Sequence, residues 1–246
     1  MNLPDNGSHN RLLAVLSAAD RALVRPFLEV IGLDARQILE APRDPISHAY
    51  FVESGLISVV GTSEPDHRIE VGMVGYEGMT GLSIVLGDDR SANETLVQSS
   101  GSALRISARA LRKAMGASPT FTDTLLRYVN VFMVQGSQTA LANGRGRLDE
   151  RLARWLLMWH DRLRDDNLTI THEFLALLLG VRRQGVTVAL HDLEGQGLIR
   201  STRSLVRILD RDGLQHAANG FYGVPEAEYD RSIGLDGRGH VKRRRR

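Results

Sequence analysis

Four side chains between residues 183 and 188 have the types and the spacing that recognition of DNA bases requires. Arg183, Gln184, Thr187 and Val188 fall on one continuous arc when the segment is drawn as a helix. Arginine pairs with guanine through two hydrogen bonds, glutamine pairs similarly with adenine, and threonine or valine contacts the thymine methyl group. We therefore interpret these residues as base contacts in a major groove. A solvated helix face would carry similar residues, and the surrounding elements favour the first interpretation.

The elements that must position this arc are two helices joined by a tight turn, within residues 171–195. Thr171 is a good N-cap for the first helix. Gly180 stands where the turn requires a positive φ, which glycine adopts without strain. Ala176, Gly180 and Val186 have the spacing of a small contact, a turn and a core anchor. This spacing is typical of a helix-turn-helix.

A run of alternating cations follows the two helices. The segment after Gly197, LIRSTRSLVRILD, is typical of two short strands joined by a turn, the wing of a winged helix. Residues 180–207 contain five arginines and two acidic residues, a net charge of +3 against +2 for the whole chain. Cations concentrated in this way neutralise DNA phosphates. We predict that the backbone contacts are Arg182, Thr171, Arg200, Arg203 and Arg207.

Two further regions precede this unit. Residues 48–106 contain short β-prone runs separated by turn residues, which is typical of a small barrel or roll. A long helical segment then begins at Pro119 and carries a stripe at spacings of four and three, formed by Leu125, Val129, Phe132 and Gly136. This stripe has the pattern of a coiled-coil seam. It favours pairing with a second copy of the chain, and a helix buried in a single core is the alternative.

Composition limits the remaining function classes. The 246 residues suffice for two domains, and the absence of cysteine excludes disulfides, thiolate catalysis and cysteine-held clusters. No apolar run spans a bilayer and no secretory signal begins the chain, so we expect a cytoplasmic protein without a membrane partner. The sequence shows no nucleophile–base pairing, P-loop or His-Glu-x-x-His pattern. We therefore expect no enzymatic activity and no metal site.

Over about residues 10–222 the sequence resembles the Crp/Fnr superfamily of bacterial transcription regulators. The resemblance rests on YFVESGLISVV in the roll, RLARWLLM after the central helix, and FLALLLGVRR, VTVAL and LEGQGLI in the winged helix. It implies an α+β fold with an N-terminal β-roll (a cyclic-nucleotide-binding-like jelly roll), a long dimerisation helix and a C-terminal winged helix-turn-helix. We accordingly expect a sensor domain at 1–115, a dimerisation helix and hinge at 116–149, a DNA-binding domain at 150–222 and a disordered basic tail at 223–246.

The glycine-rich segment at residues 72–91 corresponds to the ligand cassette of that family. Cyclic-nucleotide-responsive members carry a Gly-Glu-Leu triplet, whose glutamate holds the ribose, and a later Arg-Ser or Arg-Thr pair, which holds the phosphate. Here the Arg-Ser pair is present, but Thr80 replaces the glutamate, and Asp88 and Asp89 beside the arginine would repel a phosphate. The resemblance places an effector pocket at Gly78, Thr80, Gly81, Arg90 and Ser91. A cyclic nucleotide is disfavoured there, and no cofactor is assigned.

The sequence thus favours a homodimeric, sequence-specific regulator of transcription that binds an inverted-repeat operator in double-stranded DNA and responds to an unknown effector. The family's consensus operator does not carry over, because Gln184 and Val188 replace a glutamate and an arginine of the family's recognition helix. Contact with RNA polymerase stays open. The alternative is a ligand-binding signalling module whose winged helix docks a protein partner, and the charge on the wing favours DNA.

Overall fold

The N-terminal part of the chain is an antiparallel sheet with short helices before and after it. The computed structural model describes residues 8–64, 67–163, 165–202 and 204–234. Asn10 and Ser17 cap the first two helices, as their side chains accept hydrogen bonds from Leu13 and Asp20 backbone N–H groups. The elements of this part are α1 (Arg11–Ala14), α2 (Ala18–Val24), the 3₁₀ turn η1 (Arg25–Phe27), β1 (Glu29–Leu33), β2 (Ile38–Glu40), β3 (His48–Thr62), β4 (Arg68–Val74), α3 (Leu82–Val85), β5 (Glu94–Ser107) and α4 (Ala108–Ala117).

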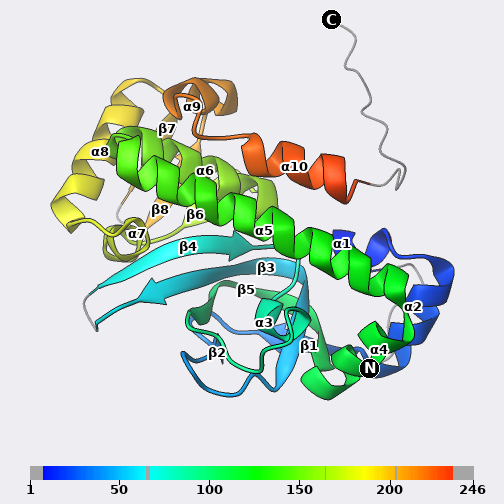
Figure 1. Ribbon diagram of the computed structural model, residues 1–246. Helices are drawn as coiled ribbons and strands as arrows, with labels where there is room; N and C mark the ends of the chain where they lie inside the picture. The colour runs from blue at the N-terminus through cyan, green and yellow to red at the C-terminus, as the bar shows by residue number, and fades with distance from the viewer. Residues whose placement is uncertain (1–7, 65–66, 164, 203, 235–246) are drawn as a thin grey trace, which may run out of the picture.

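The sheet has the strand order β1-β5-β3-β4, with β2 also paired to β5, and it is strongly curved (Figure 1). Apolar side chains of its strands form a buried cluster. The expected β-roll is therefore present. The runs at 94–101 and 102–106, which the sequence separates at a glycine, form the single strand β5. Gly101 lies against β3, where an added Cβ would come within 2.1 Å of the Ser54 carbonyl oxygen. The glycine thus marks a close approach of two strands at a register shift, not a turn.

A 27-residue helix, α5 (Pro119–Arg145), crosses the roll and continues beyond it (Figure 1). Ser118 caps the helix and Pro119 occupies its first turn, where a missing N–H has no consequence. The glycines of the 72–81 segment let helices approach: an added Cβ would lie 2.6 Å from Phe132 at Gly72 and 1.9 Å from the Tyr128 hydroxyl at Gly78. These glycines serve close packing.

The C-terminal domain packs directly against the roll. Its three-stranded sheet has the order β6-β8-β7. Its apolar core is continuous with Leu56, Val60 and Met73 of the roll, and the Trp155 indole N–H donates to Glu70 on β4 over 2.8 Å. The elements are α6 (Leu148–Leu163), β6 (Asn167–Thr169), α7 (His172–Leu179), α8 (Arg183–Gly195), β7 (Ile199–Ser201), β8 (Leu205–Ile208) and α9 (Arg211–Ala217).

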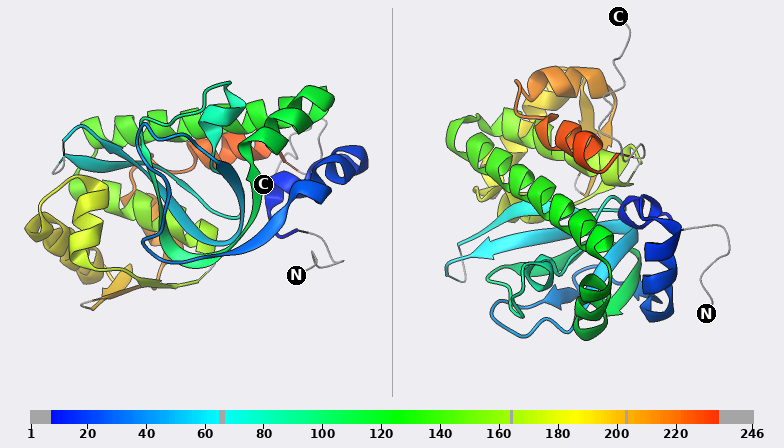
Figure 2. Two further views of the ribbon diagram at one scale, coloured as in Figure 1. Left: turned by 90° about the horizontal axis from the view of Figure 1, so that it is seen from below. Right: turned by 45° about the vertical axis from the view of Figure 1, so that its right-hand side comes forward.

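The chain then returns to the roll through α10 (Val224–Ser232), which corrects the expectation of a disordered segment from residue 223. This helix lies beside α5 in all views (Figures 1 and 2). Tyr229 and Ile233 are buried in a cluster with core residues of the roll and α5, and the Tyr229 hydroxyl donates to the Glu77 carbonyl over 2.6 Å. Polar and small residues dominate this stretch, so hydrophobic periodicity did not reveal it. The KRRRR run at 242–246 lies outside the described residues.

Candidate nucleic-acid interface and effector pocket

The helix-turn-helix geometry predicted from the sequence is confirmed. The Thr171 hydroxyl accepts a hydrogen bond from the Phe174 N–H over 3.2 Å at the start of α7. Gly180 ends α7 at φ +62°, and Ala176 and Val186 are buried between the helices, as their spacing required. An added Cβ at Gly180 would also come within 2.8 Å of the Ile69 side chain on β4. The turn therefore needs glycine for its backbone and for its contact with the roll.

The four residues interpreted as base contacts all lie exposed on α8. Arg183, Gln184, Thr187 and Val188 share the outer face of the helix, while Val186, Ala189, Leu190 and Leu193 face the core. Val188 is 60% exposed, which is high for an aliphatic residue on a helix that has a core face. A thymine methyl would cover it in a major groove.

Two of these residues contact α7, which the sequence reasoning missed. The Arg183 guanidinium forms an ion pair with Glu173 over 2.8 Å, and both side chains are 62% exposed. The Thr187 hydroxyl lies 3.1 Å from Nδ1 of His172 and donates to the Arg183 carbonyl over 3.2 Å. Helix periodicity compares residues on one helix, so these pairings between two helices gave no signal. The Arg183 guanidinium is therefore engaged by α7 in this structure.

The wing presents two arginines side by side. Arg200 on β7 and Arg207 on β8 are exposed and directly opposite each other in the antiparallel register. Like charges opposite each other are destabilising, and among the described residues neither has an acidic ion-pair partner. An anion at this position would relieve the repulsion. Arg182 and Thr171, also predicted as backbone contacts, are exposed near the turn, and Arg203 lies outside the described residues.

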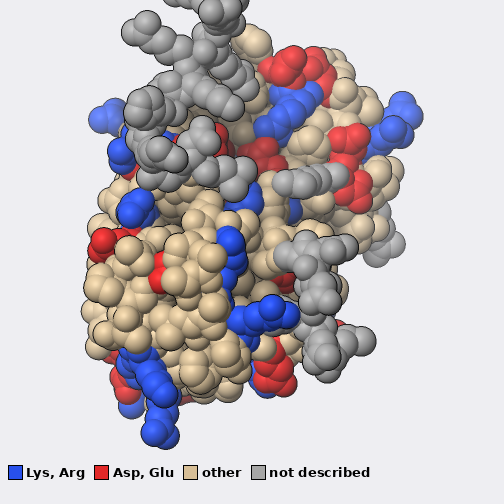
Figure 3. All heavy atoms as spheres, turned by 90° about the vertical axis from the view of Figure 1, so that its right-hand side faces the viewer, with Lys and Arg blue, Asp and Glu red and all other residues tan. Residues whose placement is uncertain are grey.

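The end of the molecule away from α7 and α8 has a different distribution of charge. There, cations and carboxylates are interspersed on the surface (Figure 3). Many of these cations have partners, for example Arg11 with Asp230 over 3.2 Å and Arg231 with Glu228 over 2.5 Å. Arg200 and Arg207 of the wing differ from these cations, because they have no acidic ion-pair partner among the described residues.

The predicted effector pocket is a cavity of about 190 Å³ between the roll and α5, and three of its five predicted residues line it: Thr80, Gly81 and Ser91. Gly78 instead packs against Tyr128. Arg90 is exposed at the surface, where its guanidinium donates to the Arg43 carbonyl over 2.6 Å and lies 3.5 Å from Asp89. The structure therefore does not bring the arginine of the matched pair into the cavity.

A carboxyl group lines this cavity that the sequence reasoning missed. Glu40, on β2, is 6% exposed and accepts a hydrogen bond from the Gly81 N–H over 2.7 Å. Burial raises the pKa of Glu40, and hydrogen bonds from Gly81, Thr80 and Thr95 oppose the rise. No lysine or arginine lines the cavity within the described part of the chain. Strand pairing brings Glu40 here from far along the sequence, so the cassette motif gave no hint of it.

The predicted dimerisation stripe faces the protein's own roll. Leu125 and Val129 are 0% and 5% exposed in the protomer core, and Phe132 packs against Gly72. Gly136 is half-buried beside β4. The prediction that this face of α5 pairs with a second copy is therefore wrong. Because α5 is apolar on several sides, its period does not indicate which side meets the sheet. The exposed large apolar residues of α5 are Leu126, Met133 and Leu141, which are 42%, 64% and 47% exposed.

Two other kinds of site are absent from the described ranges. No group of three or more histidine, aspartate or glutamate side chains there could hold a metal ion. No helix among the residues described is long and apolar enough to cross a membrane.

Comparison with known proteins assigns the C-terminal domain. Residues 150–217 match the family model described as the Crp-like helix-turn-helix domain. No curated protein matches the chain.

Solved structures of similar fold cover most of the chain. A putative transcriptional regulator of the Crp/Fnr family from Eubacterium rectale is 21% identical, with 86% of this chain and 99% of that chain covered and a TM-score of 0.65. FixK2 from Bradyrhizobium japonicum is 18% identical, covering 77% and 96%, with a TM-score of 0.68. The c-di-GMP responsive regulator CLP from Xanthomonas campestris is 17% identical, covering 78% and 99%, with a TM-score of 0.62. At these identities the likeness shows the fold.

Proposed function

We propose that this chain is a homodimeric, sequence-specific DNA-binding regulator of transcription. It carries a Crp-like helix-turn-helix domain, and its fold is that of the Crp/Fnr superfamily, as its sequence resemblance implied. The observation that carries the proposal is the exposed arc of Arg183, Gln184, Thr187 and Val188 on α8. The wing offers Arg200 and Arg207, which have no acidic ion-pair partner in the described part of the chain, for the phosphates. Base contacts specify a sequence and phosphate contacts position the protein, so the surface contains both components of an operator reader.

Selection of bound duplexes from random sequence tests this function, followed by binding measurements on arginine variants. Arg183→Ala should weaken binding by about 1–3 kcal/mol and relax the preference at one base position. Arg200→Ala should weaken binding to every sequence and reduce the salt slope by about one. Arg109→Ala, an exposed change on α4 of the roll, is the matched control and should bind as wild type does. Equal affinity of all three variants would contradict the proposal.

The homodimer forms through the exposed face of α5. Leu126, Met133 and Leu141 recur along the helix at intervals of seven and eight residues, close to a heptad repeat, and Asn130 and Ser137 lie exposed between them. A parallel or crossing partner helix would bury these side chains. Two recognition helices would then reach half-sites about one helical turn apart, roughly 34 Å, on an inverted-repeat operator. A monomer at micromolar concentration in sedimentation, or selected DNA without dyad symmetry, would contradict this arrangement.

The cavity that contains Glu40 does not take a cyclic nucleotide. A buried cyclic phosphate requires a cation, and the only arginine matched by the cassette motif lies at the surface with its guanidinium hydrogen-bonded to a backbone carbonyl. No lysine or arginine among the described residues lines the cavity to meet such a charge. Calorimetry with cyclic AMP should show no binding at micromolar concentrations. Micromolar affinity that also raises affinity for DNA would contradict this part of the proposal.

A further inference from the structure

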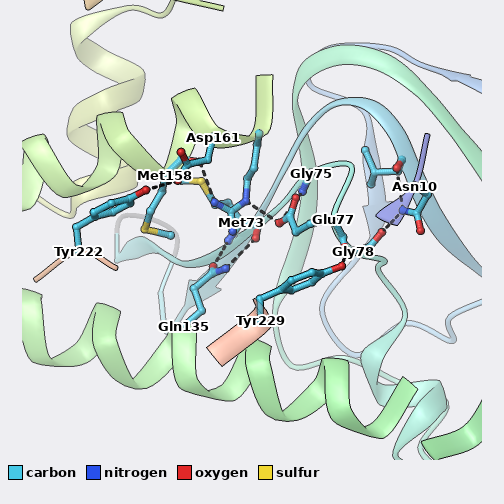
Figure 4. A network of polar contacts seen from close by, with 12 residues as sticks. Asn10, Met73, Gly75, Glu77, Gly78, Gln135, Met158, Asp161, Tyr222 and Tyr229 are labelled. Atoms are coloured by element: carbon cyan, nitrogen blue, oxygen red, sulfur yellow. Dashed lines mark hydrogen bonds and ion pairs between the residues drawn. The ribbon is translucent and has the colours of Figure 1, made fainter. Parts of the chain in front are cut away.

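A second cavity lies at the junction of the roll and the C-terminal domain, separate from the one that contains Glu40. Its volume is about 250 Å³, and its walls come from α1, the turn after β4, α5, the end of α6, the segment before α10 and α10 itself. Figure 4 shows Glu77, Gln135, Asp161, Tyr222 and Tyr229 converging on this junction from these elements. No motif in the sequence indicated it, because its residues are spread from the first helix to the last.

A buried ion pair forms one side of the cavity. Arg162 on α6 places its Nε 2.8 Å from Glu77 Oε1, and the two side chains are only 7% and 13% exposed. The Arg162 guanidinium also donates to the Met158 carbonyl over 2.8 Å. An added Cβ at Gly75 would come within 2.7 Å of the Arg162 side chain, so the glycine makes room for the pair. The positive charge of Arg162 is therefore already neutralised.

Two carboxylate oxygens at the same cavity lack a donor. Glu77 Oε2 and Glu226 Oε1 are buried and have no hydrogen-bond partner within the described part of the chain. Glu226 Oε2 accepts the Gly223 N–H over 3.1 Å, which caps α10 and fixes the side chain toward the cavity. Burial raises the pKa of Glu226. Buried carboxylate oxygens without a donor are costly, and a ligand that donates hydrogen bonds would satisfy both.

The charge of the walls selects the sign of such a ligand. Four carboxylates line the cavity, those of Glu77, Asp161, Glu226 and Asp230, against the two guanidinium groups of Arg11 and Arg162. Asp161 and Asp230 are engaged, the first by Arg211 over 2.6 Å and the second by Arg11 over 3.2 Å. Glu77 is paired with Arg162 over 2.8 Å, so the lining carboxyl without an ion-pair partner among the described residues is that of Glu226. A cation would be attracted and an anion repelled.

Much of the remaining lining is apolar or aromatic, and it includes Tyr128, Val131, Phe132, Pro225 and Tyr229. The ring of Tyr229 already carries the Arg11 guanidinium, 4.7 Å from its centroid. Aromatic faces attract cations, and the rings also accept an apolar body. The volume of about 250 Å³ exceeds the roughly 30 Å³ that one water occupies and falls below the roughly 300–1,000 Å³ of sites for drug-sized ligands. The occupant is thus a small molecule.

We propose that this cavity binds a small organic cation, an ammonium or guanidinium group on a short alkyl or aromatic body. The charged head donates hydrogen bonds to Glu77 Oε2 and Glu226 Oε1, and the body packs against Val131, Phe132 and Pro225. Since the walls belong to the roll, to α6 and to α10, the bound cation stabilises their present arrangement over others. A role of the bound cation as an effector of DNA binding rests on the proposed function, whereas the binding of the cation itself does not.

Calorimetry on the full chain tests the binding, with three probes of matched shape. 2-Phenylethylammonium should bind, and 2-phenylethanol and phenylacetate, which are neutral and anionic, should bind at least tenfold more weakly. The melting temperature should rise with the ammonium probe alone. No heat and no thermal shift with the ammonium probe, or equal affinity for the alcohol, would overturn the proposal and indicate a cavity filled by water.

Variants locate the site. Glu226→Gln keeps an oxygen that can cap α10 but removes the charge. It should lower the affinity for the ammonium probe at least tenfold. Glu228→Gln on the same helix, whose carboxylate pairs with Arg231 outside the cavity, should bind the probe as wild type does. Equal binding by Glu226→Gln would overturn the assignment. DNA binding is measured separately by anisotropy. A failure to bind DNA would contradict the proposed function, but it would not change the calorimetric result for the cation.

Discussion

Glu70 offers a direct test of how the roll is joined to the DNA-binding domain. This residue of β4 is 6% exposed, and its carboxyl accepts hydrogen bonds from the Ser58 hydroxyl over 2.5 Å and from the Trp155 indole of α6 over 2.8 Å. Burial raises the pKa of Glu70 from 4.5 to about 7, against the opposing effect of these hydrogen bonds and of the arginines at 162 and 154. The junction between the domains therefore contains a carboxyl group that prefers to be neutral.

The sign of the pH dependence follows from this rise. Between pH 4.5 and about 7 the unfolded chain releases the proton while the folded protein retains it, so the free energy of unfolding falls as pH increases. Since one pKa unit corresponds to about 1.36 kcal/mol, the full loss is about 3 kcal/mol. This loss of stability is complete above pH 7 and absent below pH 4.5.

The variant Glu70→Gln isolates this contribution, because glutamine is neutral and can still accept from Trp155. Urea unfolding should show similar stability for the variant and the wild type near pH 4.5, and a variant more stable by about 3 kcal/mol at pH 8. Glu64→Gln, an exposed change on the same roll with a side chain 73% exposed, is the control and should show no such divergence. A difference between Glu70→Gln and wild type that does not change with pH would refute the reasoning.

Four further outcomes are expected. Gly78→Ala should lower the urea midpoint by the equivalent of about 1–3 kcal/mol or more, because its Cβ would lie 1.9 Å from the Tyr128 hydroxyl. The control Gly116→Ala, whose Cβ would have nothing within 4 Å, should not destabilise the protein. Gly180→Ala should lower the free energy of unfolding by about 1–2 kcal/mol through its backbone conformation alone. An unchanged urea midpoint would show that no such strain arises. Glu173→Gln should tighten DNA binding severalfold in anisotropy by releasing its arginine partner, since exposed pairs are worth about 0.2–1 kcal/mol; weaker binding would contradict this. Met133→Glu should shift sedimentation toward the monomer, and an unchanged dimer would exclude this face of α5.

Local signals in the sequence were sufficient for the helix-turn-helix. Thr171 caps α7 and Gly180 ends it, and the residues between them specify one turn geometry, so the exposed arc of α8 could be placed by residue number. Each of these signals acts over a few residues, and tertiary contacts did not have to be known. The roll was predictable for the same reason, as short alternating runs between turn residues.

What the sequence could not indicate depends on contacts between distant segments. The face of α5 that meets the sheet is decided by glycines of the 72–81 segment, which admit Phe132 and Tyr128, and the helix period carries no information on them. Glu40 reaches the cavity between the roll and α5 through the pairing of β2 with β5. Arg90 matches a family motif in sequence, yet its side chain is held at the surface by a carbonyl of another loop.

The return of α10 to the roll has a consequence for the order in which the protein matures on the ribosome. Tyr229 and Ile233 complete an apolar cluster whose other members all lie between Leu12 and Val131. Domains generally fold as units during synthesis, N-terminal ones first. Here the first domain emerges without two of its buried side chains, and it waits for the whole DNA-binding domain to be translated before its cluster closes. A nascent chain stopped shortly before residue 224 would thus leave this apolar cluster of the roll incomplete and partly exposed to solvent.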